Sequence, residues 1–315
     1  GVPGAAPGDW YGVLTPSTDL PLRDLDAGPA RVSPSRMEAF EECGLGWVID
    51  TLGGNTVTPP SAGIGTILHA ALERFPDGDL AGLRSVVDER WSELDFETPW
   101  IAIKERARAD LYVDRLHAYL RAVRADGGVH VVSEAPFRFA IDVAPPARTE
   151  ADAPPAVYVG DEADGPRRAI VSGVIDRVET YPAGSGEHGA GRSRGWTAME
   201  CADAEAAEHV VVVDLKSGRY EKPGDGDVLQ HAQLAAYQVA VQEGLVEGAT
   251  AGGLAGARLV IVSQTLAKSD YRVAHQHRLS DEPRTEFLRR VAEAARGMSA
   301  SSFTAQVDAH CTEGM

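Results

Sequence analysis

The chain has 315 residues, a length that allows one large domain or two ordinary ones, and 43% of them are hydrophobic, which is ample for a sizeable core. Its formal charge of −17 makes the surface as a whole repel nucleic acid, so any action on DNA requires local basic patches, bound divalent cations or a basic partner. Three widely spaced cysteines exclude a disulfide framework and fit a reducing compartment, and no membrane-length apolar run or signal pattern is present, so we expect a cytoplasmic protein.

The N-terminal region separates into a linker and the start of a helical portion. Residues 1–30 are rich in Pro, Gly and Asp without periodicity, which is typical of a linker from a preceding region and indicates a piece of a longer polypeptide. We expect residues 31–315 to form one domain. Ser33 and Pro34 are suited to the N-cap and first position of a helix, and apolar residues at three- and four-residue spacing continue it to Gly53.

Three further helices are predicted before the first strand, at about 63–75, 80–94 and 100–124. The first carries His69 and Glu73 one turn apart, so these two side chains share a face. The helix 100–124 is the most basic segment of an acidic chain. It is either an ordinary solvated face or a surface that contacts phosphates.

From Val129 the apolar period changes to that of β-strands, and helices resume only later. The expected strands are 129–141, 169–180, 209–216, 258–265 and 271–279, and the expected later helices are 228–243 and 282–298. Two segments rich in Pro, Gly, Ala and acidic residues, 144–162 and 182–208, are predicted to be long loops.

The strand at 209–216 contains the central stretch of the sequence. Val210–Val213 are four β-branched residues in a row, which indicates a strand buried on both faces. Asp214 and Lys216 follow two positions apart and therefore point to the same side of the sheet. Taken alone, this pair is either an exposed ion pair at a strand end or a place for a metal and a polarised water.

A second carboxylate, Asp176, follows Gly173 near the end of the strand 169–180. Without the loop 182–208, this strand and 209–216 would be neighbours in a hairpin, with Asp176 and Asp214 at one end of the sheet. On the helix that follows, Gln233 and Tyr237 share a face.

The ordered set Gly65-Thr66-x-x-His69, Gly173-x-x-Asp176, Asp214-x-Lys216 and Gln233-x-x-x-Tyr237 resembles the motifs of the PD-(D/E)XK nuclease superfamily, and within it the RecB-like nuclease domain. The surrounding sequence, over roughly 32–311, is similar to the C-terminal nuclease modules of bacterial helicase-nucleases of the AdnAB/UvrD type. The resemblance implies a restriction-endonuclease-like α/β fold, with a central mixed sheet flanked by helices and an N-terminal helical portion.

The resemblance also implies roles for individual residues. The implied metal ligands are His69, Asp176, Asp214 and the backbone carbonyl of Leu215; the implied catalytic lysine is Lys216, supported by Gln233 and Tyr237. Two carboxylates and an imidazole suit Mg²⁺ or Mn²⁺, and a lysine beside the metal can orient or deprotonate the attacking water. The residues alone leave structural roles open beside these functional ones. His69 is either a metal ligand or a core histidine, and Gln233 and Tyr237 are either site residues or packing residues. Glu73 is interpreted as a helix-face carboxylate rather than a metal ligand.

The cysteines only partly match the iron–sulfur site that the resemblance implies. Cys43 matches the early position and Cys311 the start of the C-terminal cluster, but the third place is Gly314, and Cys201 lies in a long acidic loop. Since a [4Fe–4S] cluster takes four ligands, we expect no cluster in the chain as given.

The implied function is that of a metal-dependent deoxyribonuclease, the nuclease part of a helicase-nuclease in double-strand break processing and repair. Because the chain has no P-loop motif, we expect a helicase motor in the same polypeptide or a partner subunit to deliver the DNA, with single strands favoured. Exonuclease and endonuclease modes both remain open. The alternatives are an inactive nuclease fold that guides DNA or serves in assembly, and a metal-dependent hydrolase of another substrate class.

Overall fold

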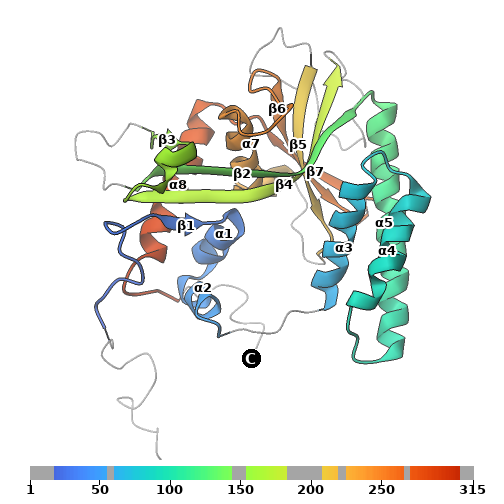
Figure 1. Cartoon of the computed structure of the whole chain (residues 1–315), viewed down its shortest axis with the longest axis horizontal. Coiled ribbons are helices and arrows are strands. Elements are labelled where there is room, and N and C mark those ends of the chain that lie inside the picture. The colour runs from blue at the N-terminus through green and yellow to red at the C-terminus, as the bar shows by residue number, and fades with distance from the viewer. Residues whose placement is uncertain are drawn as a thin grey trace, which may run out of the picture.

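The computed structural model describes residues 18–54, 60–143, 154–182, 208–218, 225–265 and 270–305. These residues form a mixed β-sheet with helices on both faces (Figure 1). The predicted α/β class, consistent with a restriction-endonuclease-like domain, is therefore confirmed. No helix among the described residues is long and apolar enough to cross a membrane.

The sheet has the strand order β3-β2-β4-β5-β6-β7, with β1 paired in parallel to β4. The strands are β1 Ala30–Val32, β2 Val129–Asp142, β3 Val157–Tyr158, β4 Arg168–Pro182, β5 Glu208–Lys216, β6 Leu254–Ile261 and β7 Arg272–His277. The expected neighbours β4 and β5 pair antiparallel, with Arg177 opposite Val213, whereas β5 and β6 are parallel. This pairing places the C-terminal end of β5, with Asp214 and Lys216, beside the middle of β4 at Asp176. Asp176 therefore does not end its strand as predicted, because β4 continues to Pro182.

Helices cover the two faces of the sheet in separate groups. The helices are α1 Pro34–Glu42, α2 Gly44–Thr51, α3 Pro60–Arg74, α4 Leu80–Arg90, α5 Pro99–Ala125, α6 Asp225–Val228, α7 Ala232–Gln242 and α8 Asp281–Met298, with short 3-10 turns at Trp91–Glu93 and Gly160–Asp164. One apolar core lies between the sheet and α1, α2, α7 and α8; the other lies between the sheet and α3, α4 and α5. Figure 1 shows the second group along one side of the molecule.

The central strand β5 belongs to both cores. Val210 and Val212 pack in the first core, Val211 and Val213 pack in the second, and all four are no more than 2% exposed. The predicted burial of this strand on both faces is therefore confirmed.

The helix predicted from Ser33 to Gly53 is two helices. The start is as expected, because the Ser33 side chain accepts a hydrogen bond from Arg36 N (3.4 Å) and Pro34 follows it. At Cys43, however, the backbone is extended, with φ −157° and ψ 104°, and Cys43 Sγ accepts a hydrogen bond from Gly46 N (3.3 Å) to cap α2. A one-residue break leaves the apolar spacing almost unchanged, so the sequence pattern did not reveal it.

Several other boundaries differ from the predictions. The expected loop 144–162 contains β3 and a 3-10 turn, because Val157 and Tyr158 extend the edge of the sheet beside β2. The expected helix 228–243 is interrupted at 229–231, β6 begins at Leu254, and β1 was not predicted. Residues 144–153 and 183–207 lie outside the described residues.

The segment before β1 contacts the folded chain. Leu22 N donates to Ala300 O (3.0 Å), and Arg167 N donates to Leu25 O (2.7 Å). Residues 1–17 lie outside the described residues, and the division into a linker and a domain at residue 30 stays a prediction.

A buried charged network joins α5 to β4 and β6. Glu179 is fully buried and accepts hydrogen bonds from Arg177 Nε (2.7 Å) and from the hydroxyls of Tyr119 (3.0 Å) and Tyr181 (2.6 Å). The Arg258 guanidinium, 1% exposed, lies 3.4 Å from the same carboxylate. The two guanidinium groups thus have a buried carboxylate as their partner of opposite charge. The Tyr119 hydroxyl joins helix α5 to this carboxylate and so ties the helical side of the fold to the sheet.

Candidate active site

Strands β4 and β5 bring the two predicted aspartates together. Asp176 and Asp214 are buried, at 7% and 1% exposure, on adjacent strands. Leu215 N donates a 2.7 Å hydrogen bond to Asp176 Oδ2, so the backbone of β5 orients the carboxylate of β4. The expected role of the Leu215 carbonyl as a metal ligand stays a prediction.

Helix α3 brings His69 to the same place. His69 Nδ1 lies 3.3 Å from Asp176 Oδ1, at ion-pair distance, and its side chain is 31% exposed. One turn earlier, a Cβ atom on Gly65 would lie 2.9 Å from Ser217 Oγ. Gly65 thus permits α3 to run close to the end of β5, which explains a glycine four residues before the histidine.

Glu134 of β2 is the residue that the sequence analysis missed. Its Oε1 lies 3.9 Å from His69 Nδ1, and the ligand atoms of His69, Glu134 and Asp176 all lie within 4.8 Å of one another. Glu134 stands between the pairs Ser133–Arg177 and Ala135–Ile175, directly beside Asp176. Its φ of 50° is unusual for a residue other than glycine, and residues strained in this way cluster at active sites and ligand-binding sites. A register shift earlier in β2, between 130 and 132, hides this alignment from the sequence pattern.

The remaining predicted residues form a chain of contacts beginning at Asp214. Lys216 Nζ lies 2.9 Å from Asp214 Oδ2 and donates to Gln233 Oε1 at 2.9 Å. Gln233 Nε2 donates to the Tyr237 hydroxyl (2.6 Å), which in turn donates to Asp214 Oδ1 (3.3 Å). The four side chains therefore close a ring between β5 and α7. Such a ring fixes the lysine ammonium at the strand end.

Gly173 makes room for an aromatic side chain that packs against Tyr237, a member of these four hydrogen-bonded side chains. A Cβ atom at Gly173 would lie 3.0 Å from the ring of Phe137, its partner on β2. The Phe137 ring meets Tyr237 edge to face, with centroids 5.7 Å apart. The glycine of the Gly173-x-x-Asp176 motif thus serves the position of Tyr237 through Phe137.

The carboxylates perturb one another electrostatically. Burial raises the pKa of Asp214 to about 6, Lys216 opposes this shift, and Asp176 adds to it. Burial, followed by the charge of Asp176, raises the pKa of Glu134. Burial lowers the pKa of His69, but the hydrogen bond and charge of Asp176, with Asp214 and Glu134, outweigh it, so the pKa is raised overall. Burial is thus the largest cause at Asp214 and Glu134, whereas at His69 the neighbouring carboxylates outweigh burial.

This donor set fits a hard divalent cation. Carboxylate oxygens with one imidazole are ligands that Mg²⁺ and Mn²⁺ accept, and a bound cation would offset the repulsion between Asp176, Glu134 and Asp214. The group whose ligand atoms lie mutually within 4.8 Å consists of His69, Glu134 and Asp176. Asp214 lies beside this group, and its carboxylate contacts Lys216 and Tyr237 instead. Glu73 is exposed and does not belong to the group.

Two arginines of the basic helix α5 form ion pairs within the chain. Arg106 donates to Asp110 (3.1 Å) and to Asp88, and Arg108 forms an ion pair with Glu105. These two guanidinium groups are already neutralised by carboxylates, whereas Lys104, Arg121 and Arg124 are exposed. Both interpretations of the helix, a solvated face and a surface that contacts phosphates, therefore stay predictions.

The cysteine positions can be described only in part. Cys43 is half-buried at the junction of α1 and α2. The chain returns beside it near its C-terminal end, where Leu45 N donates to Thr304 O (3.2 Å) and the Phe303 and Trp47 rings lie 5.9 Å apart. Cys201 and Cys311 lie outside the described residues, so the expected absence of a [4Fe–4S] cluster stays a prediction.

Comparison with known proteins agrees with this geometry. No curated protein sequence matches the chain. The family model of the PD-(D/E)XK nuclease superfamily, in contrast, matches residues 31–188 and 202–313, which include every residue of the site described above. Since the match extends over most of the sequence, the chain belongs to the PD-(D/E)XK nuclease superfamily.

Proposed function

We propose that this chain is a metal-dependent deoxyribonuclease that hydrolyses phosphodiester bonds. The observation that carries the proposal is the convergence of His69, Glu134 and Asp176 beside the Asp214–Lys216 pair. Metal ligands and a lysine ammonium at one strand end are the groups that phosphodiester hydrolysis requires.

In this proposal the cation is held by His69, Glu134 and Asp176, with Asp214 as a further ligand. A bound Mg²⁺ or Mn²⁺ supplies a polarised water and neutralises charge on the phosphoryl oxygens. Asp176 is positioned for this role by the Leu215 N–H, and His69 is positioned by the close approach of α3 to Ser217.

Lys216 acts on the water and on the phosphate. Its Nζ is held between Asp214 and Gln233, so the ammonium has a fixed location from which to orient the attacking water. It also stabilises the negative charge that develops on the phosphoryl oxygens. Gln233 and Tyr237 support it by keeping Lys216 and Asp214 in place.

The proposed biological role is the nuclease part of a RecB-like helicase-nuclease that processes double-strand breaks. The net charge of −17, and the pairing of Arg106 and Arg108 of α5 with carboxylates, give the chain little attraction of its own for DNA. A helicase motor, on the same polypeptide or a partner, would deliver single strands and raise their effective concentration at the site.

A substrate panel tests the proposed chemistry. The chain is incubated with labelled single-stranded DNA, duplex DNA, RNA and a small phosphodiester, in Mg²⁺, Mn²⁺ or EDTA. We expect DNA cleavage that requires the metal and that a Lys216→Met variant lacks. Labels at the 5′ and 3′ ends distinguish exonuclease from endonuclease products. A protein that cleaves none of the nucleic acids would contradict the proposal and support a guiding or assembly role, and cleavage of the small phosphodiester alone would indicate another hydrolase.

A further inference from the structure

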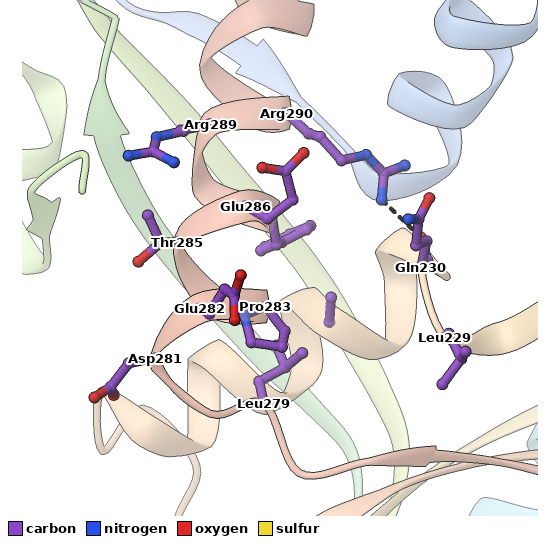
Figure 2. A pocket seen from close by; sticks show the side chains of 12 residues that line it. Leu229, Gln230, Leu279, Asp281, Glu282, Pro283, Thr285, Glu286, Arg289 and Arg290 are labelled. Carbon is purple, nitrogen blue, oxygen red and sulfur yellow. Dashed lines mark hydrogen bonds between the residues drawn. The ribbon is translucent and has the colours of Figure 1, made fainter. Parts of the chain in front are cut away.

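The N-terminus of α7 determines where Gln233 lies, and the connection leading to it is open on its outer side. A cavity of about 840 Å³ lies between this connection and α8, and Leu229, which lines it, is 56% exposed (Figure 2). With an open cavity on that side, packing alone does not fix residues 229–231. Their location depends on hydrogen bonds from neighbouring elements.

Two side chains hold the carbonyl groups of this connection. Arg290 Nη1 of α8 donates to Gln230 O (2.8 Å), the interaction drawn as a dashed line in Figure 2. From β7, Gln276 Nε2 donates to Val228 O (2.8 Å) and lies within hydrogen-bond distance of His231 O (3.2 Å). Arg290 is itself fixed by a two-point ion pair with Glu41 of α1, at 3.1 and 2.7 Å.

A third side chain holds the first N–H of α7. Glu38 of α1 accepts a 2.7 Å hydrogen bond at Oε1 from Ala232 N, the first residue of the helix. The first N–H groups of a helix have no partner within the helix, and a carboxylate there also interacts favourably with the helix dipole. The His231 ring accepts from Leu234 N (3.5 Å) and so caps a later N–H. Glu38 and His231 therefore anchor different N–H groups of the same turn.

This turn carries the side chain that holds Lys216. Gln233 is the residue after Ala232, and its Oε1 accepts the hydrogen bond from Lys216 Nζ (2.9 Å). We propose that Glu38 is a positioning residue for Lys216: by fixing the first turn of α7, it sets the location of the Gln233 amide and hence of the ammonium. The kinetic part of this inference rests on the proposed nuclease function.

The expected effect follows from the sensitivity of catalysis to position. A displacement of about 1 Å in a catalytic group can lower a rate by about 100-fold. Loss of the Glu38 contact should therefore lower kcat by roughly 10- to 100-fold and leave KM nearly unchanged, since Glu38 lies outside the proposed metal and phosphate contacts.

Two substitutions of Glu38 distinguish the length of its side chain from its charge. Glu38→Asp keeps the charge but is one methylene shorter, so it should lose the contact with Ala232 N and most of the activity. Glu38→Gln keeps an acceptor oxygen at the same reach and should retain the activity. Ser33→Ala is the matched control, because it removes the N-cap of α1 and destabilises that helix without touching α7. Equal losses in Glu38→Asp and Ser33→Ala would overturn the inference.

A double-mutant comparison tests the route of the effect. If Glu38 acts through Gln233, adding Glu38→Asp to Gln233→Ala should lower kcat little further than Gln233→Ala alone. Additive losses would show that Glu38 acts by another route and would overturn the inference.

A spectroscopic readout is independent of activity. The lysines of the chain are Lys104, Lys216, Lys222 and Lys268, so reductive ¹³C-methylation gives a sparse NMR spectrum. The Lys216 resonance, assigned by its loss in Lys216→Arg, should shift in Glu38→Asp and stay in place in Ser33→Ala and Glu38→Gln. An unshifted resonance in Glu38→Asp would overturn the positioning role. A protein that cleaves no DNA yet shows the shift would refute the proposed function and leave the positioning role standing.

Discussion

Leu215 N and Asp176 Oδ2 are joined by a 2.7 Å hydrogen bond between two neighbouring strands. The bond uses one oxygen of the carboxylate and leaves Oδ1 facing His69 Nδ1 at 3.3 Å. The backbone of the strand that carries Asp214 and Lys216 thus orients the carboxylate of the other strand. A small displacement of β5 against β4 would move Asp214 and Lys216 and would also change the orientation of the Asp176 carboxylate. The site therefore depends on the register of the sheet as much as on its side chains.

The first prediction concerns catalysis. Asp176→Asn, Asp214→Asn and Lys216→Ala should each lower DNA cleavage by roughly 10³-fold or more, and double variants should lose little further activity, because the groups act as one unit. Asn at 176 keeps an oxygen that can accept from Leu215 N, so the fold should survive. Single-turnover cleavage assays with circular dichroism measure this. Glu73→Gln, an exposed carboxylate one turn after His69 that lies outside the group of candidate metal ligands, is the control that should remain active. A folded Lys216→Ala protein with near-normal activity would refute the catalytic assignment.

The second prediction concerns the metal and Glu134. Glu134→Gln and His69→Ala should each weaken Mn²⁺ binding by roughly 10-fold or more. In metal sites, loss of a residue that only hydrogen-bonds to a ligand already lowers the metal affinity by about that factor. Isothermal titration of the metal-free protein with Mn²⁺ gives the affinities. Unchanged affinity in Glu134→Gln would show that the strained Glu134 backbone serves another purpose.

The third prediction concerns stability and pH in the absence of metal. The pKa of Asp214 rises from its ordinary 3.8 to about 6, chiefly through burial. Between these two values the folded state keeps a proton that the unfolded chain has released, so this group's contribution to stability falls as pH rises from about 4 to above 6. At pH 7.5 in EDTA, Asp214→Asn should therefore be more stable than the parent, by up to about 3 kcal/mol.

Thermal unfolding at pH 4 and pH 7.5, with and without Mn²⁺, measures this effect. The stabilisation should disappear at pH 4, where the Asp214 carboxyl is protonated in the folded parent. Saturating Mn²⁺ should favour the parent, because a ligand that binds only the folded state stabilises it. An Asp214→Asn protein less stable than the parent at pH 7.5 in EDTA would contradict the prediction.

The fourth prediction concerns the buried network around Glu179. Glu179→Ala would leave Arg177 and Arg258 buried without their carboxylate partner, and loss of one member of a buried ion pair typically costs about 3–5 kcal/mol. Urea denaturation followed by circular dichroism gives the free energy of unfolding. The control is Asp114→Ala, which breaks the exposed ion pair with Arg84 and should cost less than about 1 kcal/mol. Similar losses in both variants would show that the network contributes no more than a surface pair.

The fifth prediction concerns DNA delivery. With a charge of −17, the isolated chain should bind a single-stranded oligonucleotide weakly at physiological salt without metal. Arg106→Ala should change this affinity little, because the Arg106 guanidinium is already paired with Asp88 and Asp110. Fluorescence anisotropy at several salt concentrations tests both statements. Nanomolar binding without metal would remove the need for a motor or partner to deliver the strand.

Much of the fold and most of the candidate site followed from local sequence. The run Val210–Val213 indicated a strand buried on both faces, because a strand with one exposed face would have polar residues at alternate positions and this run has none. The two-residue period of strands then placed Asp214 and Lys216 on one side, where the structure has them in contact. The four-residue period of helices likewise placed Gln233 and Tyr237 together. These relationships depend only on backbone geometry within one element.

Only the tertiary structure decided the relationships between elements. Glu134 faces Asp176 because of the register between β2 and β4, and a register shift near residue 131 makes that alignment unreadable from the sequence. The contact from Glu38 to Ala232 joins helices 194 positions apart, and no periodic pattern encodes such a pairing. Side-chain spacing within a helix or strand is set by covalent geometry, whereas the neighbours across a core are set by how the whole chain packs.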